Sequence, residues 1–204
     1  MAARGRPKSD EKRQQILDAS ADLFTEQGYE RTSLEQVADR AEVSKQTIYN
    51  NFTSKESLLR AGVLRKCEEA MIAGEDLDYS LPPSEFLPLF ADRFISSLTE
   101  EKPLAMYRLV MTESQRHPEV GVAFYDSGPM PVMKALAEYL KVATDRGELN
   151  VQEPLMAAAQ YLFSINGFTV DMALVGISEE ARPFPTEAYV EHCTASFLRA
   201  NAAN

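Results

Sequence analysis

Apolar residues recur every three or four positions along most of the chain, which is the spacing of one face of an α-helix. No stretch shows the sustained alternation of apolar and polar residues that is typical of a half-buried strand. The pattern therefore predicts an all-α fold. The expected helices span residues 11–27, two short segments within 32–52, and residues 55–73, 84–98, 103–115, 118–126, 131–146, 154–176 and 186–200.

The composition excludes several classes of protein. Of the 204 residues, 45% are hydrophobic and 25% are charged, which is ordinary for a globular protein and excludes wholesale disorder. Two cysteines, Cys67 and Cys193, are too few for a disulfide framework and form no zinc motif, so we expect a reducing, cytoplasmic setting. We expect neither a signal peptide nor a membrane partner, because no apolar run is long enough to span a bilayer.

The excess negative charge lies in one part of the chain. The net charge is −10, from 21 basic and 31 acidic residues, which taken alone argues against a nucleic-acid partner. Residues 1–60, however, hold ten basic and ten acidic side chains, so all of the excess falls in residues 61–204. This asymmetry indicates two modules with different partners and leaves a DNA-binding first module open.

Residues 32–52 have the spacing of a helix-turn-helix, with a tight turn at 41–43 between two short helices. Small Ala38 and apolar Val43 and Ile48 suit the contact between these helices. The outward positions of the second helix are Lys45, Gln46, Thr47, Tyr49 and Asn50. Such a mixed polar face suits base edges and phosphates, but a solvated face of a plain three-helix bundle explains the spacing equally well.

The exact residues resemble the DNA-binding domain of the TetR family of bacterial regulators. The match covers roughly residues 10–60 and rests on Phe24, Gly28, Thr32-Ser33, Val37-Ala38, Val43-Ser44, Ile48-Tyr49, Phe52, Ser54-Lys55-Glu56 and Leu58-Leu59. The resemblance implies an all-α, one-component transcriptional regulator, usually a repressor, that binds a palindromic operator as a homodimer. It implies a three-helix DNA-binding head in residues 1–54 and a helical ligand-binding and dimerisation domain in residues 55–204, bridged by the helix from residue 55.

The resemblance also assigns roles to single residues. Thr32 and Ser33 match positions that contact phosphate, and Lys55 matches a lysine that contacts the DNA backbone. Lys45, Gln46 and Thr47 match the face that reads bases, and Tyr49 and Asn50 match positions that contact phosphate or base. Ser44 is a further candidate DNA contact. Family members usually have glycine where Glu42 stands, and often where Gln46 stands. We therefore expect Glu42 to adopt a positive φ and to place an acid near DNA.

The segment before the first helix contains Arg4-Gly5-Arg6-Pro7, which resembles the core of an AT-hook. Residues 1–13 carry five cations and two carboxylates, a net charge of +3. An extended arm of this kind would let Arg4 and Arg6 enter a narrow minor groove. The alternative is an ordinary solvated terminus.

The expected helix 154–176 is apolar on every side, so it must be covered on every side. A partner subunit is the simplest cover, and in TetR-like proteins the last two long helices form the dimer interface. The expected interface residues are Leu155, Leu162, Ile165, Met172, Val190, Cys193 and Phe197. A central helix of a monomer is the alternative.

Residues 108–128 are similar to the AefR-like C-terminal domains of this family, which have no single ligand class. We expect a small, partly apolar effector, because a pocket needs apolar walls and a few polar groups. The candidate pocket residues are Phe90, Phe94, Met106, Arg108, Met111, His117, Met133, Gln160, Phe163 and Asn166. For each of them an ordinary core or surface role is the alternative, and Asn166 could instead form an interhelical hydrogen bond.

The sequence predicts neither catalysis nor a bound metal or cofactor. The only histidines, His117 and His192, lie in separate helical patterns without a nucleophile or metal-ligand motif. A helical ligand- or protein-binding dimer that has lost DNA binding is the alternative function. The retained Lys45, Tyr49 and Lys55 argue against it.

Overall fold

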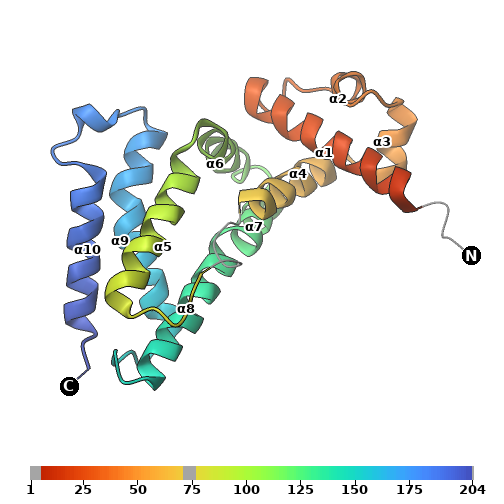
Figure 1. The fold of residues 1–204 in the computed structure, drawn as a ribbon. Helices are drawn as coiled ribbons and strands as arrows, with labels where there is room; N and C mark the ends of the chain where they lie inside the picture. The colour runs from red at the N-terminus through yellow and green to blue at the C-terminus, as the bar shows by residue number, and fades with distance from the viewer. Residues whose placement is uncertain (1–5, 71–76, 204) are drawn as a thin grey trace, which may run out of the picture. The chain divides into compact units, whose positions relative to one another are not determined.

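The computed structural model describes residues 6–70 and 77–203. Within these ranges the chain is helical throughout, apart from connecting segments and one isolated β-bridge between Leu149 and Ala202, which confirms the all-α prediction (Figure 1). The helices are α1 Arg6–Gln27, α2 Leu34–Arg40, α3 Lys45–Asn51, α4 Lys55–Ala70, α5 Pro83–Thr99, α6 Glu101–Glu113, α7 Pro118–Ser127, α8 Pro129–Asp145, α9 Pro154–Leu174, the 3₁₀ turn η1 Glu179–Ala181 and α10 Thr186–Ala200. None of the helices in the described residues is long and apolar enough to cross a membrane.

Packing divides the chain into two compact units. The head unit comprises Met1–Glu69 and Ala105–Ser127, and the C-terminal unit comprises Ala70–Leu104 and Gly128–Asn204. This division differs from the one expected at residues 54 and 55. The physical reason is that α4 and the segment Ala105–Ser127 bury their apolar residues against the first three helices.

The core of the head unit forms around α1. Ile16 and Phe24 of α1, Ile48 of α3 and Leu58 of α4 are buried together. Val120 of α7 belongs to the same core. These positions follow the helical spacing of the sequence, so the burial of one apolar face accounts for the packing of short helices that would be marginal alone.

In the C-terminal unit, α9 packs against α5, α8 and α10 (Figure 1). The rings of Phe86 on α5 and Tyr139 on α8 are stacked with centroids 3.4 Å apart. The buried Tyr161 hydroxyl of α9 donates a hydrogen bond to the Leu87 carbonyl (3.2 Å) and lies 2.8 Å from the Thr194 hydroxyl of α10. This buried phenol therefore ties three helices together.

A glycine follows the end of α8. Gly147 has φ +75°, a conformation that glycine adopts without a Cβ clash. The N–H of Glu148 donates to the Ala143 carbonyl at 3.0 Å, which satisfies one of the free carbonyls at the helix end.

Candidate nucleic-acid interface

Two side-chain caps build the helix-turn-helix. Ser33 caps α2: its hydroxyl accepts the Gln36 N–H, and the Gln36 side chain accepts the Ser33 N–H, so the two form a reciprocal capping box. Ser44 caps α3 by accepting the N–H of Thr47. These two caps fix where each short helix begins.

The turn between α2 and α3 depends on Glu42, which has φ +53°, as predicted. The N–H of Val43 donates to the Ala38 carbonyl at 2.9 Å across this turn. A residue with a Cβ is strained in this left-handed conformation. Glu42 therefore closes the turn at an energetic cost that a glycine would avoid.

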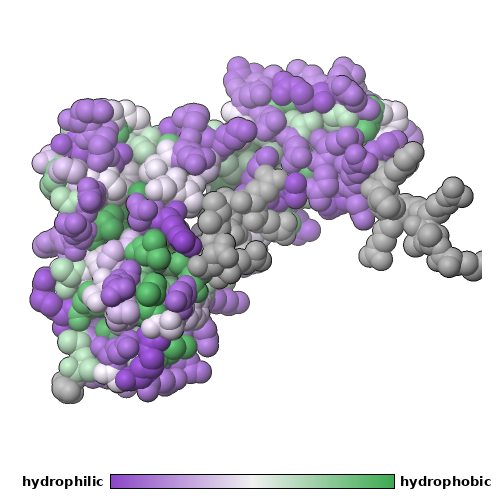
Figure 2. All heavy atoms as spheres, viewed as in Figure 1, coloured by the Kyte–Doolittle hydropathy of each residue, from purple (hydrophilic) through white to green (hydrophobic). Residues whose placement is uncertain are grey.

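The outward face of α3 is polar and open to solvent. Ser44, Lys45, Gln46, Tyr49 and Asn50 are exposed, whereas Ile48 is buried beneath them. The Gln46 amide donates to the Asn50 side chain at 3.0 Å. Hydrophilic residues cover most of the visible surface of the head unit (Figure 2). The side chains predicted to read bases thus lie together on one accessible helix face, with Thr47 half-buried at its edge.

Lys45 is paired with Glu35 of α2, a residue that sequence reasoning missed. Their hydrogen bond raises the pKa of Lys45 and lowers the pKa of Glu35 from their ordinary values, so both groups stay charged. The Lys45 ammonium also lies 5.9 Å from the centre of the Tyr49 ring. A carboxylate thus stands beside the cation of the candidate DNA-binding face.

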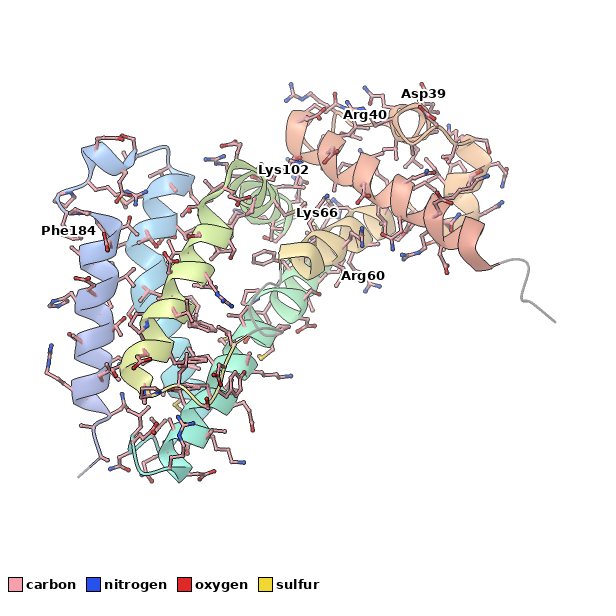
Figure 3. The ribbon with its side chains drawn as sticks, viewed as in Figure 1. Asp39, Arg40, Arg60, Lys66, Lys102 and Phe184 are labelled. Atoms are coloured by element: carbon pink, nitrogen blue, oxygen red, sulfur yellow. The ribbon has the colours of Figure 1, made fainter. Side chains whose placement is uncertain are left out.

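A second ion pair braces the head. Both terminal guanidinium nitrogens of Arg40, labelled on α2 in Figure 3, donate to the Glu26 carboxylate of α1 at 3.2 and 3.1 Å. This two-bond geometry orients α2 against α1.

The structure corrects the role expected of Thr32. Its side chain is only 2% exposed, and its hydroxyl donates toward the carbonyls of Gly28 (2.9 Å) and Leu23 (3.2 Å). Its N–H donates to the Tyr29 carbonyl. Thr32 therefore holds the α1–α2 turn together instead of offering its hydroxyl and N–H to phosphate.

Ser33 also has fewer groups available for a phosphate than expected. Its N–H is already engaged in the capping box, so only its hydroxyl hydrogen remains for a phosphate. The sequence could not separate Thr32 from Ser33, because both residue types are good helix caps.

The N-terminal arm differs from the expectation where the structure describes it. Arg6 begins α1, and Pro7 stands in the first turn, where its missing N–H is tolerated. The expected extended arm is therefore helical from Arg6 onward. Arg4 lies outside the described residues, and minor-groove contacts of Arg4 and Arg6 stay a prediction.

Lys55, the expected phosphate-gripping lysine, opens α4 and folds over an aromatic ring. Its ammonium nitrogen lies 4.1 Å from the centre of the Tyr29 ring and donates to the Glu30 carbonyl at 3.5 Å. Sequence reasoning missed this contact between Lys55 and Tyr29. Among the described residues, no group of histidine, cysteine and carboxylate side chains could hold a metal ion.

The ten candidate pocket residues are distributed over both units. Met106, Arg108, Met111 and His117 belong to the head unit, and Phe90, Phe94, Met133, Gln160, Phe163 and Asn166 belong to the C-terminal unit. Phe90 and Phe94 stack at 6.3 Å, and Phe90 and Met133 share the core of the C-terminal unit. Arg108, Met111, Gln160 and Phe163 are exposed, which does not fit the wall of an interior pocket.

Asn166, one of the candidate pocket residues, has a side-chain oxygen that is unsatisfied among the described residues. This oxygen is buried and has no hydrogen-bond partner among residues 6–70 and 77–203. Such an acceptor is costly to leave unsatisfied, so a donor from a ligand or partner would stabilise it.

The structure corrects three of the expected interface residues. Leu162, Ile165 and Phe197 are buried in the core of the C-terminal unit itself, with Leu162 only 5% exposed. Leu155 is exposed, and Met172, Val190 and Cys193 are half-buried. Other apolar residues of α9 are more exposed to solvent: they include Met156, which is 71% exposed, and Phe163, which is 67% exposed.

Two family models match the chain. Residues 16–61 match the model of bacterial regulatory proteins of the tetR family, and residues 85–203 match the C-terminal domain of AefR-like transcriptional repressors. Together they cover the helix-turn-helix and most of the helices that follow it.

The chain is also similar to individual transcriptional regulators. The transcriptional regulator UidR of Escherichia coli K12 is 24% identical over 172 residues, which are 83% of this chain and 85% of UidR. The solved structure of the flavonoid-responsive regulator FrrA is 32% identical, with a TM-score of 0.79 over 94% of this chain and 97% of FrrA. A structure from Mesorhizobium loti, assigned to the TetR-family regulators, has the same fold, with a TM-score of 0.81 at 24% identity over 97% of this chain and 100% of that chain.

Both family models describe transcriptional regulators, and the similar proteins are assigned to the same class, which is not enzymatic.

Proposed function

We propose, from the premise that this chain belongs to the TetR family of bacterial regulatory proteins, that it is a repressor which binds a palindromic operator as a homodimer. We further propose that a small, partly apolar effector releases it from DNA. The observation that carries the proposal is the exposed polar face of α3, where Lys45, Gln46 and Tyr49 stand on a rigidly capped helix. A helix of this kind enters the major groove with its first residues against base edges.

An exposed stripe on α9, which carries the large apolar side chains of Met156 and Phe163, supports the homodimer. Met156, Gln160, Phe163 and Gly167 follow one another at intervals of four, three and four residues, so they lie along one side of the helix. A side chain at Gly167 would meet nothing within 4 Å, which leaves room for another helix to approach closely. A second copy of this chain is the partner we propose, because a two-fold interface presents both heads to a palindrome.

The chemistry of the effector is proposed from a relative. FrrA is a flavonoid-responsive regulator that is 32% identical to this chain over nearly its whole length. Flavonoids carry aromatic rings with a few hydroxyl groups, which agrees with the partly apolar effector expected from the sequence. Flavonoids are therefore the first compounds to test.

Selection of bound duplexes from a random DNA pool tests the function directly. We expect enrichment of a palindrome whose half-sites lie about 34–36 Å apart, one helical turn, or a multiple of that distance. Repeating the selection with Gln46→Ala should relax the preference at particular base pairs, because the amide of Gln46 can make two hydrogen bonds to adenine. No enrichment with the wild-type protein would favour the alternative of a helical dimer that has lost DNA binding.

A further inference from the structure

The lysine at the start of α4 is held by an aromatic platform. The Lys55 ammonium lies 4.1 Å above the centre of the Tyr29 ring, and its second contact is the neighbouring Glu30 carbonyl. A cation at this distance from a ring face is attracted by the negative charge of the face. The long side chain of Lys55 is therefore restrained before any DNA is present.

The platform itself is fixed in place. Tyr29 is 4% exposed, and its ring packs against Phe24 of α1 with centroids 5.5 Å apart. Burial, and then the Glu56 carboxylate, raise the pKa of Tyr29 above its ordinary value, so the phenol stays neutral.

The Glu56 carboxylate stays ionised. Hydrogen bonds from its own backbone N–H, from Ser54 and from Tyr29 hold the pKa of Glu56 below its ordinary range. Glu56 therefore remains an ionised carboxylate.

Support for the ring also comes from the turn between α6 and α7. His117 contacts the Tyr29 ring edge to face, with centroids 5.1 Å apart, and Arg116 pairs with Glu30 at 3.1 Å. The N–H groups of Arg116 and His117 both donate to the Glu113 carbonyl, at 3.0 and 2.8 Å. Arg116 and His117, which are consecutive in this turn, thus contact the consecutive residues Glu30 and Tyr29.

We propose that Tyr29 is a positioning residue for DNA binding: its ring, supported by His117, holds the Lys55 ammonium for a phosphate of the DNA backbone. The proposal rests on the DNA-binding function proposed above. Its physical basis is preorganisation, since a lysine already restrained over a ring loses less rotamer entropy when it binds. A purely structural Tyr29 would affect stability but would not act through Lys55.

A double-mutant cycle on DNA affinity separates these two roles. The variants are Tyr29→Leu, Lys55→Gln and the double variant, with Tyr29→Phe as the matched control that keeps the ring and loses the hydroxyl. The full-length protein is titrated with a fluorescent mixed-sequence duplex at several salt concentrations, because a phosphate contact does not depend on sequence. Thermal melting of each variant reports folding.

We expect Tyr29→Leu to weaken binding by about threefold to tenfold and to lower the salt slope by up to about one, as the loss of the Lys55 contact would. We expect Tyr29→Phe to bind like the wild type. In the Lys55→Gln background, Tyr29→Leu should have no further effect. An equal loss of affinity in both backgrounds, or no loss in either, would overturn the proposal.

His117→Ala provides a second cycle, which decides the question if Tyr29→Leu does not fold. It removes one support of the ring and leaves the Tyr29 ring itself in place. We expect it to weaken binding when Lys55 is present and not when Lys55 is replaced; additive effects would overturn the proposal. If the wild-type protein binds no duplex at any salt concentration, the DNA-binding function itself fails, which is a different result from an additive cycle.

Discussion

Lys45 of α3 forms an ion pair with Glu35 of α2, so the cation of the candidate DNA-binding helix already has a carboxylate partner in the free protein. The two groups hold each other in the charged state, as the opposite shifts of their pKa values indicate. A phosphate or a guanine that approaches Lys45 must therefore compete with, or share the cation with, a carboxylate. We therefore propose that Glu35 limits sequence-independent binding of the head to DNA.

Replacing Glu35 with Gln should strengthen binding to mixed-sequence DNA. The substitution frees Lys45 and removes a negative charge near the candidate interface, so we expect about a twofold to fivefold gain in affinity and a steeper salt dependence. Anisotropy titrations at several salt concentrations measure both quantities. Glu191→Gln on α10 is the control, since it removes the same charge from the C-terminal unit. An equal gain with the two variants would mean that only net charge matters.

Glu42 offers a way to separate backbone strain from charge. Glu42→Gly removes the Cβ that is strained at φ +53°, and we expect the free energy of unfolding to rise by up to about 1 kcal/mol. Glu42→Ala keeps the strain and removes the same carboxylate, so it should share any gain in DNA affinity without the gain in stability. Urea unfolding of the two variants makes the comparison. Equal stability of the Glu42→Gly and Glu42→Ala proteins would show that the turn stores no strain.

The head was predictable because its local signals agree with one another. The structure confirms the positive φ predicted for Glu42 in the turn. Ser33 and Ser44, which it places at the two N-cap positions, are of a residue type preferred there. The ion pair between Glu35 and Lys45 was not predictable, since it joins two helices through side-chain rotamers that no sequence pattern encodes. The inward hydroxyl of Thr32 was hidden for the same reason.

In the C-terminal unit, the sequence could not predict which residues of α9 are buried. A helix that is apolar on every side has no periodicity to reveal which face meets the core, so the neighbouring positions Leu162 and Phe163 could not be distinguished. The structure buries Leu162 and exposes Phe163. The predicted segment was therefore right, but the residues assigned to its outer face were partly wrong.

This distinction gives a test of the proposed dimer. Phe163→Glu places a charge on the exposed stripe, so we expect monomers that keep their helical content, because the side chain contributes little to the core of its own subunit. Light scattering after size-exclusion chromatography measures the mass. Val122→Glu on α7 is the matched control, since Val122 is another exposed apolar residue. A Phe163→Glu protein that remains dimeric would place the interface elsewhere.

The buried phenol of Tyr161 predicts a loss of stability at alkaline pH. Burial raises the pKa of Tyr161 to about 12, from an ordinary value near 10, so the neutral phenol stabilises the fold below pH 10. This contribution should be lost as the pH rises from about 10 to about 12, because the unfolded chain ionises first.

Tyr161→Phe should therefore flatten the decrease in unfolding free energy over this interval. At neutral pH the same variant should lower the free energy of unfolding by about 1 kcal/mol, because the hydrogen bond to Leu87 and the contact with Thr194 are lost. Urea unfolding between pH 7 and 12 is the measurement, with pH values chosen to bracket the two pKa values. A Tyr161→Phe protein with an unchanged alkaline decrease would mean that the decrease arises from other groups.

The proposed release of DNA by an effector makes a thermodynamic prediction that needs no knowledge of the pathway between the two sites. If a flavonoid weakens operator binding, the operator must weaken flavonoid binding by the same factor, with a typical coupling of about 1–3 kcal/mol. Calorimetric titration of a flavonoid that binds the protein, with and without saturating duplex from the random-pool selection, measures this factor. We expect weaker flavonoid binding in the presence of the duplex, and Lys55→Gln, which weakens the DNA contact, should require more duplex to produce the same effect. Equal flavonoid affinities at saturating duplex would show that the two sites are not coupled, and the protein would then be a regulator that flavonoids do not release from DNA.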